Sequence, residues 1–376
     1  MDLGLIAGEA SGDLLGAHFV RALKQNHPYL CAAGIAGPRL VDAGVTALYP
    51  SDRLAVNGYV EVLAHLPELL WIRSRITRRF LDERPRVFVG IDAPDFNFAL
   101  EAKLKAAGIP TVHFVSPSIW AWRPERIHRI KQAVSHMLVV FPFEEAIYRD
   151  AGIPVSYVGH PLADTIPLEP DTAAARAELG MKAGPVIALL PGSRRSEVKR
   201  HAGLMLDAAQ LILRHHPDAR FVLPAAGETV AALIEQARAG RALPLTVLAG
   251  QSHAALAACD VALVASGTAT LETALFKKPM VITYRVPALT AYLMRKQALL
   301  PWIGLPNILA RDFVVPERVQ EDATPENLAA DALAWLADAP RRQALAERFH
   351  ALHVSLRQDA AARIAEALAP YLDGRA

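Results

Sequence analysis

The sequence predicts an α/β protein with two Rossmann-like, doubly wound parallel-sheet domains that face each other across a cleft. Short apolar segments alternate with helical segments from the first residue to about residue 160, which is the pattern of repeated βαβ units. A polar stretch with Pro167 and Pro170 then indicates a linker, and the same alternation restarts at Pro185. A chain of 376 residues is long enough for a hydrophobic core in each domain.

Composition narrows the class of protein. Hydrophobic residues make up 52% and charged residues 21%, which is typical of a globular chain rather than a disordered one. A net charge of +2 does not suggest a nucleic-acid binder. Cys31 and Cys259 are far apart and lack a metal-ligand spacing, which suits a reducing cytosol. The first residues are typical of a strand rather than a signal peptide, and no apolar run approaches the roughly 18 residues of a membrane span.

The first strand is expected at Leu3–Ala7, followed by a glycine-rich turn and a helix over residues 14–24. Ser11 or Asp13 is expected to cap that helix. The turn lacks the GxGxxG spacing of a dinucleotide site, and its carboxylates would repel phosphate. Glu9 stands at the strand end, where open α/β sheets bind their substrates.

The strand predicted at residues 87–91 ends in the most chemically loaded turn of the first half. Asp92, Asp95 and Asn97 follow the strand directly, and Pro94 stiffens the turn. Asp95 has a simpler role as a cap of the next helix. Asp92 is a candidate general base, with helix capping as the alternative interpretation.

A second such turn, SPSIWAWR at residues 116–123, follows the strand predicted at 111–115. Trp120 and Trp122 either pack against the core or line a pocket at the strand end, and the sequence leaves both interpretations open. The remaining strands are expected to end near 34–37 and to cover residues 137–140, 155–158, 186–190, 221–224, 245–248, 261–265 and 279–284.

Residues 60–80 form a predicted basic amphipathic helix. Its apolar residues recur at helical spacing. Between them stand a tryptophan and four arginines, namely Trp71, Arg73, Arg75, Arg78 and Arg79. One interpretation is a surface helix that packs on the core and keeps its arginines in solvent. The other is contact with an anionic lipid surface, to which residues 287–303, within an apolar stretch that carries Arg295 and Lys296, would add a second contact.

Two turns in the second half follow buried strands and open helices. The first, at residues 191–197, carries Arg194 and Arg195, whose planar guanidinium groups suit phosphate oxygens. The second, at residues 265–272, ends in Glu272, a candidate acceptor for ribose hydroxyls. Free backbone N–H groups at a helix start attract phosphate. Each turn alone is equally well an ordinary β–α connection, but the pair favours a nucleotide diphosphate lying across the strand ends.

Six segments carry a resemblance to a known family: GEASGD at 8–13, GIDAPDFN at 90–97, SPSIWAWR at 116–123, PGSR at 191–194, ASGTATLE at 265–272 and LPN at 305–307. They occur in order from the first strand to the last helices, and several are long and unusual. On these motifs the chain resembles the lipid-A-disaccharide synthase family, which are glycosyltransferases of the GT-B class, family 19.

The resemblance implies a GT-B fold with the acceptor domain and a membrane-facing helix at residues 1–165. It places the UDP-sugar domain at 166–345 and a carboxyl-terminal helix, packing back on the first domain, at 346–376. The implied reaction is an inverting hexosyl transfer from UDP-2,3-diacylglucosamine to 2,3-diacylglucosamine 1-phosphate (lipid X). It gives the β-1,6-linked lipid A disaccharide 1-phosphate and UDP.

The resemblance also bears on cofactors and partners. It implies no metal and no other cofactor. It implies a cytoplasmic enzyme in peripheral contact with the cytosolic face of the inner membrane, with no nucleic-acid partner. Dimers that exchange carboxyl-terminal segments occur in the family, and the sequence leaves a homodimer open.

The family's functional residues carry over onto matching positions. Asp92 matches the candidate catalytic base and Glu9 an essential strand-one carboxylate, and which of the two is the base stays open. Substrate-binding positions are expected at Ser11, Asn97, Trp122, Gly192, Ser193, Arg194, Ser266, Gly267, Thr268, Glu272, Asn307 and Gln320.

Three alternatives share the same sequence features in part. A UDP-GlcNAc 2-epimerase would have no need of the basic amphipathic helix. The transferase that builds the peptidoglycan lipid intermediate is a second UDP-sugar enzyme of this fold. A non-catalytic UDP-sugar sensor would keep Arg194 and Glu272 but would have no use for the turn at residues 92–97.

Overall fold

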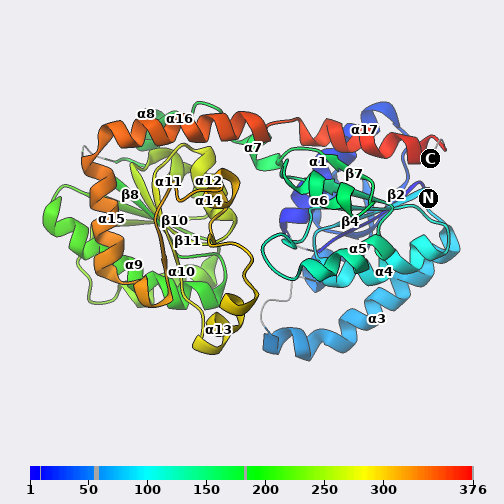
Figure 1. The fold of residues 1–376 in the computed structure, drawn as a ribbon, viewed down its shortest axis with the longest axis horizontal. Helices are drawn as coiled ribbons and strands as arrows, with labels where there is room; N and C mark the ends of the chain where they lie inside the picture. The colour runs from blue at the N-terminus through cyan, green and yellow to red at the C-terminus, as the bar shows by residue number, and fades with distance from the viewer. Residues whose placement is uncertain (9, 55–58, 182–183, 375–376) are drawn as a thin grey trace. The chain divides into compact units, whose positions relative to one another are not determined.

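The structure, a computed structural model, describes residues 1–8, 10–54, 59–181 and 184–374. The chain divides into two compact units (Figure 1). Unit 1 comprises Met1–Asp164 and Ser355–Ala376, and unit 2 comprises Thr165–Val354. The chain therefore passes from one unit to the other twice, after Asp164 and after Val354.

Unit 1 is built on a seven-stranded sheet with the order β3-β2-β1-β4-β5-β6-β7, in which every recorded strand pair is parallel. The strands are β1 Leu3–Ala7, β2 Ala32–Ala36, β3 Val45–Pro50, β4 Val87–Ile91, β5 Thr111–Phe114, β6 His136–Val139 and β7 Val155–Tyr157. The strand order reverses between β1 and β4. Their carboxyl ends therefore form the switch point at which open α/β sheets bind ligands.

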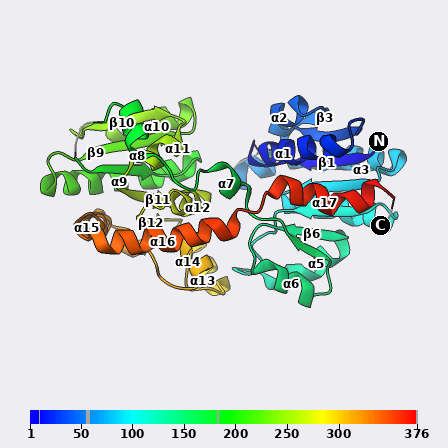
Figure 2. The ribbon, with the colours of Figure 1, turned by 90° about the horizontal axis from the view of Figure 1, so that it is seen from above.

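Helices cover both faces of this sheet. Figures 1 and 2 show α1 and α17 side by side on one face, with α3, α4 and α5 on the other. The helices of unit 1 are α1 Ala10–Asn26, α2 Pro38–Asp42, α3 Tyr59–Glu83, α4 Pro94–Ala106, α5 Ile127–Ala133, α6 Glu144–Asp150, α7 Pro161–Thr165 and α17 Ala360–Leu372, with short 3-10 turns η1 Ser51–Arg53 and η2 Pro124–Arg126.

The position of α3 follows from its apolar spacing. Ile72, Ile76 and Phe80 recur every fourth residue, so they lie on one helical face and pack against Phe88 of β4 and Leu104 of α4. All five side chains are buried. The opposite face of α3 remains in solvent and carries the arginines.

Unit 2 contains a six-stranded sheet with the order β10-β9-β8-β11-β12-β13, again with every recorded pair parallel. The strands are β8 Val186–Leu190, β9 Arg220–Ala225, β10 Leu245–Ala249, β11 Val261–Ala265, β12 Met280–Tyr284 and β13 Glu317–Val319. The order reverses between β8 and β11, so this sheet also has a switch point.

Both faces of the second sheet are covered as well. Helices α9, α10 and α15 pack on one face, and α8, α11 and α12 on the other (Figure 1). The helices of unit 2 are α8 Thr172–Glu178, α9 Arg195–His215, α10 Glu228–Arg238, α11 Ser252–Ala258, α12 Thr268–Leu275, α13 Ala288–Gln297, α14 Leu305–Ala310, α15 Pro325–Ala337 and α16 Ala339–Leu356, with the 3-10 turn η3 Gln320–Asp322.

Candidate active site

The turn after β4 combines a carboxylate with an unusual backbone. Asp92 and Ala93 have φ angles of 51° and 45°, in the left-handed region that residues other than glycine rarely adopt. The Asp92 amide donates to Phe114 O of β5 (2.9 Å), and Asn97 Nδ2 donates to Asp92 O (2.7 Å). Asp92 is half-buried at the switch point between β1 and β4, and Asn97 is fully buried.

The turn after β1 lies beside it. A Cβ on Gly8 would approach Ala93 Cβ to 2.9 Å, so only a residue without a side chain lets the two turns meet so closely. Glu9, the second candidate carboxylate, lies outside the described residues. Ser11 falls in the first turn of α1, and its side chain is likewise not described.

Two aspartates near these turns differ from their predicted capping roles. Asp13 lies inside α1, and its carboxylate accepts from three backbone amides at the start of α2, those of Gly37, Arg39 and Leu40 (2.8, 3.0 and 3.1 Å). Asp95 does not cap α4, whose N-cap residue is Ala93 and which has no side-chain cap. Its side chain is 86% exposed and pairs with Arg126.

The two tryptophans in the loop after β5 have different surroundings. Trp120 donates from Nε1 to Glu144 Oε1 (3.0 Å), and the second oxygen of Glu144 accepts from the Phe141 amide (3.0 Å). Glu144 is buried, and this desolvation raises the pKa of its carboxyl to about 7. Trp122 is 42% exposed, and the Arg123 guanidinium lies 4.6 Å from the centre of its ring. Trp120 therefore fastens the loop, while Trp122 faces solvent.

The two turns singled out in unit 2 follow neighbouring strands, β8 and β11, at the second switch point. In the first, Gly192 has a φ of 111°, and a Cβ there would lie 2.5 Å from Glu197 Oε2. The same oxygen accepts from the Arg194 amide (3.3 Å), and the Arg194 guanidinium lies 3.8 Å from Glu197 Oε1. Ser193 and Arg194 are exposed at the start of α9. The Glu197 side chain therefore accepts from a backbone N–H at the start of α9 and lies beside the Arg194 guanidinium.

The second turn is more open. A Cβ on Gly267 would contact no described atom within 4 Å, and Thr268 is exposed. Ser266 is half-buried and donates from Oγ to Ile303 O (2.9 Å). Glu272 is half-buried on α12, with its Oε1 at 3.7 Å from His253 Nε2. The turn therefore presents backbone, a hydroxyl and a carboxylate at one strand end.

His201 connects the first turn to β12 and was not predicted. Its Nε2 accepts from the Arg285 amide (2.9 Å), so its proton is on Nδ1, which points to Pro191 O at 3.3 Å. The ring stacks on Tyr284, with centroids 5.4 Å apart. Burial lowers the pKa of His201, which favours this neutral form. Only its position on the apolar face of α9 could have signalled it.

The side-chain amides of Asn307 and Gln320 form hydrogen bonds within unit 2. The fully buried Asn307 amide accepts from the Val314 and Val315 amides and donates to Val315 O and to Glu317 Oε1 (2.8–3.0 Å). Gln320, with a φ of 54°, bonds both the N–H and the carbonyl of Val286 (2.7 and 3.0 Å). Both side chains therefore hold the chain around β12 and β13.

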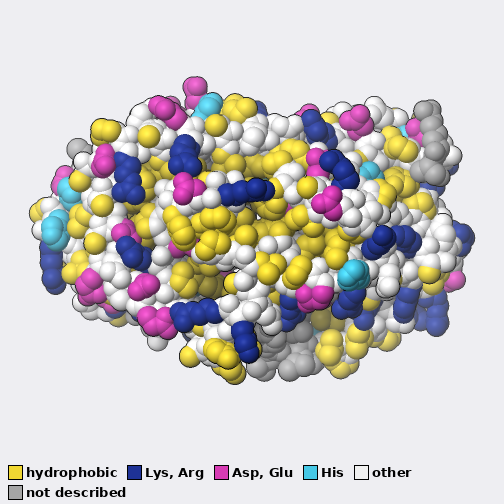
Figure 3. Space-filling view, in the orientation of Figure 1, with side chains coloured by type: hydrophobic (Ala, Val, Ile, Leu, Met, Phe, Trp, Pro, Cys, Tyr) yellow, Lys and Arg dark blue, Asp and Glu magenta, His cyan; other side chains and the backbone are white. Residues whose placement is uncertain are grey.

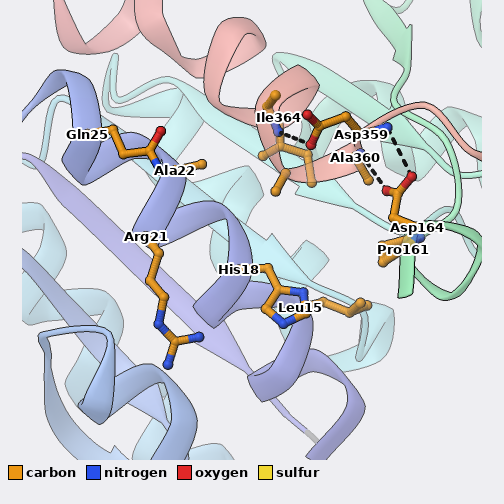
Figure 4. Close-up of a pocket in the computed structure, with 12 residues that line it drawn as sticks. Leu15, His18, Arg21, Ala22, Gln25, Pro161, Asp164, Asp359, Ala360 and Ile364 are labelled. Carbon is orange, nitrogen blue, oxygen red and sulfur yellow. Dashed lines mark hydrogen bonds between the residues drawn. The ribbon is translucent and has the colours of Figure 1, made fainter. Parts of the chain in front are cut away.

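A separate pocket of about 400 Å³ lies between α1 and α17 of unit 1 (Figure 4). His18 and Arg21 line it from α1, and Asp164 and Ile364 from the opposite wall. The Asp164 carboxylate accepts from the backbone N–H groups of Asp359 and Ala360 (3.0 and 2.7 Å), so it adds a second capping contact at the start of α17, whose N-cap residue is Asp359. None of the predicted site residues whose side chains the structure describes lines this pocket.

In the part of the chain that the structure describes, no three His, Cys, Asp or Glu side chains are grouped so as to hold a metal ion. No helix in that part combines the length and the apolar character needed to cross a membrane.

Comparisons with solved structures identify the fold. A UDP-GlcNAc 2-epimerase from Neisseria meningitidis bound to UDP-GlcNAc superposes with a TM-score of 0.68 at 13% identity, covering 98% of this chain and 100% of that one. Anabaena HepE in complex with UDP and glucose superposes with a TM-score of 0.58 at 15% identity, covering 98% of each chain. The two parallel α/β sheets therefore belong to a GT-B-like fold, as predicted.

Sequence comparisons identify the family. The family profile described as Lipid-A-disaccharide synthetase matches residues 3–368. The lipid-A-disaccharide synthase of Thiobacillus denitrificans is 78% identical over 369 residues, which cover 98% of this chain and 99% of the relative. That of Aromatoleum aromaticum is 54% identical over 376 residues, covering 99% and 96%. The chain therefore belongs to the lipid-A-disaccharide synthase family and is a glycosyltransferase of lipid A biosynthesis.

Proposed function

We propose that the enzyme transfers 2,3-diacylglucosamine from UDP to the 6-hydroxyl of 2,3-diacylglucosamine 1-phosphate. The acceptor oxygen attacks the anomeric carbon, the bond from that carbon to the UDP oxygen breaks, and the acceptor proton passes to an enzyme base. One displacement inverts the α-linked donor to a β-1,6 linkage and releases UDP. The observation that carries the assignment is that Asp92 and both glycine turns of unit 2 stand at sheet switch points.

The donor is assigned to unit 2. The turns after β8 and β11 offer backbone N–H groups at helix starts, and Arg194 supplies a cation for the diphosphate. Glu197 competes for the same helix end, with its Oε1 at 3.8 Å from the Arg194 guanidinium. The Arg194 side chain is 56% exposed and the Glu197 side chain 16% exposed, so the guanidinium can leave Glu197 and turn toward a diphosphate, whose oxygens it binds more strongly. Glu272 is assigned to the ribose hydroxyls.

The acceptor is assigned to unit 1, with Asp92 as the base. A half-buried carboxylate at a switch point can accept the proton of the attacking hydroxyl, typically for a gain of about 10² to 10⁴. Glu9 is the alternative base. Trp122, exposed beneath Arg123, is assigned to the acceptor rather than to the core.

Two surfaces are proposed to contact lipid at the cytosolic face of the inner membrane. On α3, Leu66, Leu70 and Trp71 are exposed beside the arginines, and Trp71 is 56% exposed. On α13, the exposed side chains include Leu289 (73%), Tyr292 and Lys296. Figure 3 shows hydrophobic side chains gathered over both helices with lysines and arginines beside them. This combination suits an anionic interface.

A homodimer stays a prediction, to be tested by light scattering.

One assay separates this function from its rivals. UDP release from the diacylated donor is measured with and without the phosphorylated acceptor. The proposal expects release that requires acceptor and matches disaccharide formation in amount. Acceptor-independent release or epimerised donor would favour an epimerase. Donor binding with no turnover under any condition would favour a sensor.

A further inference from the structure

A buried polar cluster lies directly behind the Asp92 turn. Asn97, Glu101 and His113 are all fully buried, on α4 and β5. His113 Nδ1 and Glu101 Oε1 are 2.7 Å apart. The cluster covers Gly90 of β4, where a Cβ would overlap Glu101 Oε1 and lie 3.2 Å from Asn97 Cβ. Gly90 therefore makes room for the cluster two residues before Asp92.

Packing does not account for these side chains. Three of their polar atoms, Asn97 Oδ1, Glu101 Oε2 and His113 Nε2, are buried and have no hydrogen-bond partner among the described residues. Buried polar atoms in this state cost stability, and apolar residues of similar size would avoid that cost. Burial also raises the pKa of the Glu101 carboxyl. The cluster therefore makes the folded state less stable than apolar residues of similar size would.

The contacts of the cluster point to the Asp92 backbone. The Asn97 side chain donates from Nδ2 to Asp92 O (2.7 Å). The Asn97 backbone N–H donates to Ala93 O (3.0 Å). Asp92 and Ala93 both have left-handed φ angles, which persist only where the surroundings over-determine them. Asn97 bonds both carbonyls of this strained pair, and Glu101 lies one helical turn behind Asn97.

We propose that Asn97, Glu101 and His113 form a positioning unit that fixes the left-handed Asp92–Ala93 backbone and so aims the Asp92 carboxylate at the acceptor hydroxyl. The inference rests on the proposed role of Asp92 as base. Asn97 then acts on the reaction through Asp92 rather than by touching substrate. Small errors in the placement of a catalytic group are costly, because general base catalysis needs hydrogen-bond reach to the proton.

A double-mutant cycle tests this dependence. Asn97→Ala is made in the wild-type chain and in Asp92→Asn, and turnover and KM are measured for donor and acceptor. We expect Asn97→Ala to lower kcat by roughly tenfold to a hundredfold in the wild-type chain, with the KM of the donor little changed. In Asp92→Asn the same change should lower kcat less than threefold, because no base remains to be aimed.

Thr111→Val is the matched control. Thr111 is a fully buried polar residue on the same strand, two residues before His113, and its Oγ1 donates to Ala133 O (2.7 Å). This variant should lose thermal stability as Asn97→Ala does but keep its kcat. Glu101→Gln should keep a larger share of turnover than Glu101→Leu, because a side-chain amide can still form a hydrogen bond with His113 Nδ1 and a leucine cannot. That comparison stands if Asn97→Ala does not fold.

The outcomes separate the two proposals. If Asp92→Asn turns over at near the wild-type rate, Asp92 is not the base and the positioning role fails with it. If Asp92→Asn is inactive but Asn97→Ala lowers kcat equally in both backgrounds, the base stands and the positioning unit is overturned. Equal losses for Glu101→Gln and Glu101→Leu would also overturn it.

Discussion

Asp92 is the residue on which the proposed chemistry depends most directly. Asp92→Asn keeps the shape of the side chain and removes its basicity, so turnover should fall by about 10² to 10⁴. UDP affinity should be unchanged, because the turns assigned to the donor belong to unit 2. Single-turnover UDP release and UDP titration calorimetry measure the two quantities. Near-normal turnover in Asp92→Asn together with an inactive Glu9→Gln would mean that the wrong carboxylate has been assigned.

Arg194 carries the second residue-scale prediction. Arg194→Ala removes a donor expected to stabilise charge on the departing diphosphate, so turnover should fall by on the order of a hundredfold. Arg195→Ala is the matched control, since Arg195 is an exposed arginine at the next position and should matter less. A folded Arg194→Ala enzyme with ordinary turnover would refute the assignment.

The residues that the sequence could not reveal share one property. His201, Glu144, Glu101 and His113 acquire their roles through contacts with distant parts of the chain, as His201 does with Arg285. A lone histidine or glutamate on a helix has no local signature of such a contact. Strand-end residues such as Asp92 could be found, because their exposure to ligand follows from topology alone.

At the scale of elements, α3 is the packed surface helix of the first interpretation, and lipid contact, the second interpretation, stays a prediction. Its buried stripe packs on the core, and its other face carries exposed Arg75, Arg78 and Arg79. Each arginine near an anionic surface contributes about 1 kcal/mol. Changing Arg75 and Arg78 to Glu should therefore lower co-sedimentation with anionic vesicles, and added salt should do the same. Arg214→Glu, an exposed change on α9, is the control. Unchanged vesicle binding would leave α3 a packed surface helix only.

The loop after β5 gives a pH prediction. Burial raises the pKa of Glu144 from 4.5 to about 7 in the folded enzyme. The folded state therefore holds a proton that the unfolded chain has lost between these pH values, and unfolding free energy falls as pH rises from 4.5 to 7. This loss amounts to about 3 kcal/mol at most. Denaturant titrations should show a flatter pH profile for Glu144→Gln. Identical profiles for both proteins would contradict it.

Not all elements could be predicted from the sequence. The regular βαβ alternation gave the central strands, because buried parallel strands are continuous apolar runs. The edge strands β3 and β13 were missed. In β3 only Val45 is buried, and β13 begins with the charged Glu317 and Arg318, so neither forms such a run. The predicted role of Asp13 as a cap of the first helix was wrong for a different reason. Its hydrogen-bond partners, between Gly37 and Leu40, follow the next strand, and no local pattern shows that contact.

At the scale of the whole molecule, the chain returns to unit 1 for its last segment, Ser355–Ala376. This segment is held at the start of α17, where the backbone N–H groups of Asp359 and Ala360 donate to the Asp164 carboxylate. Asp164 is the last residue of unit 1 before the chain enters unit 2. Its side chain therefore links the point where the chain leaves unit 1 to the segment with which it returns. Stability of α17 should therefore depend on a residue almost two hundred positions away.

Asp164→Ala tests this connection. Loss of a helix cap costs about 1 kcal/mol, which should raise the exchange rate of α17 amides roughly fivefold while β8 and β11 keep their protection. Asp171→Ala is the matched control, because Asp171 caps α8 within unit 2 and accepts from the Ala174 amide (2.9 Å). That variant should loosen α8 and leave α17 unchanged. Hydrogen exchange followed by mass spectrometry resolves both helices. Equal protection of α17 in the wild-type chain and in Asp164→Ala would show that packing on α1 alone holds the returning segment.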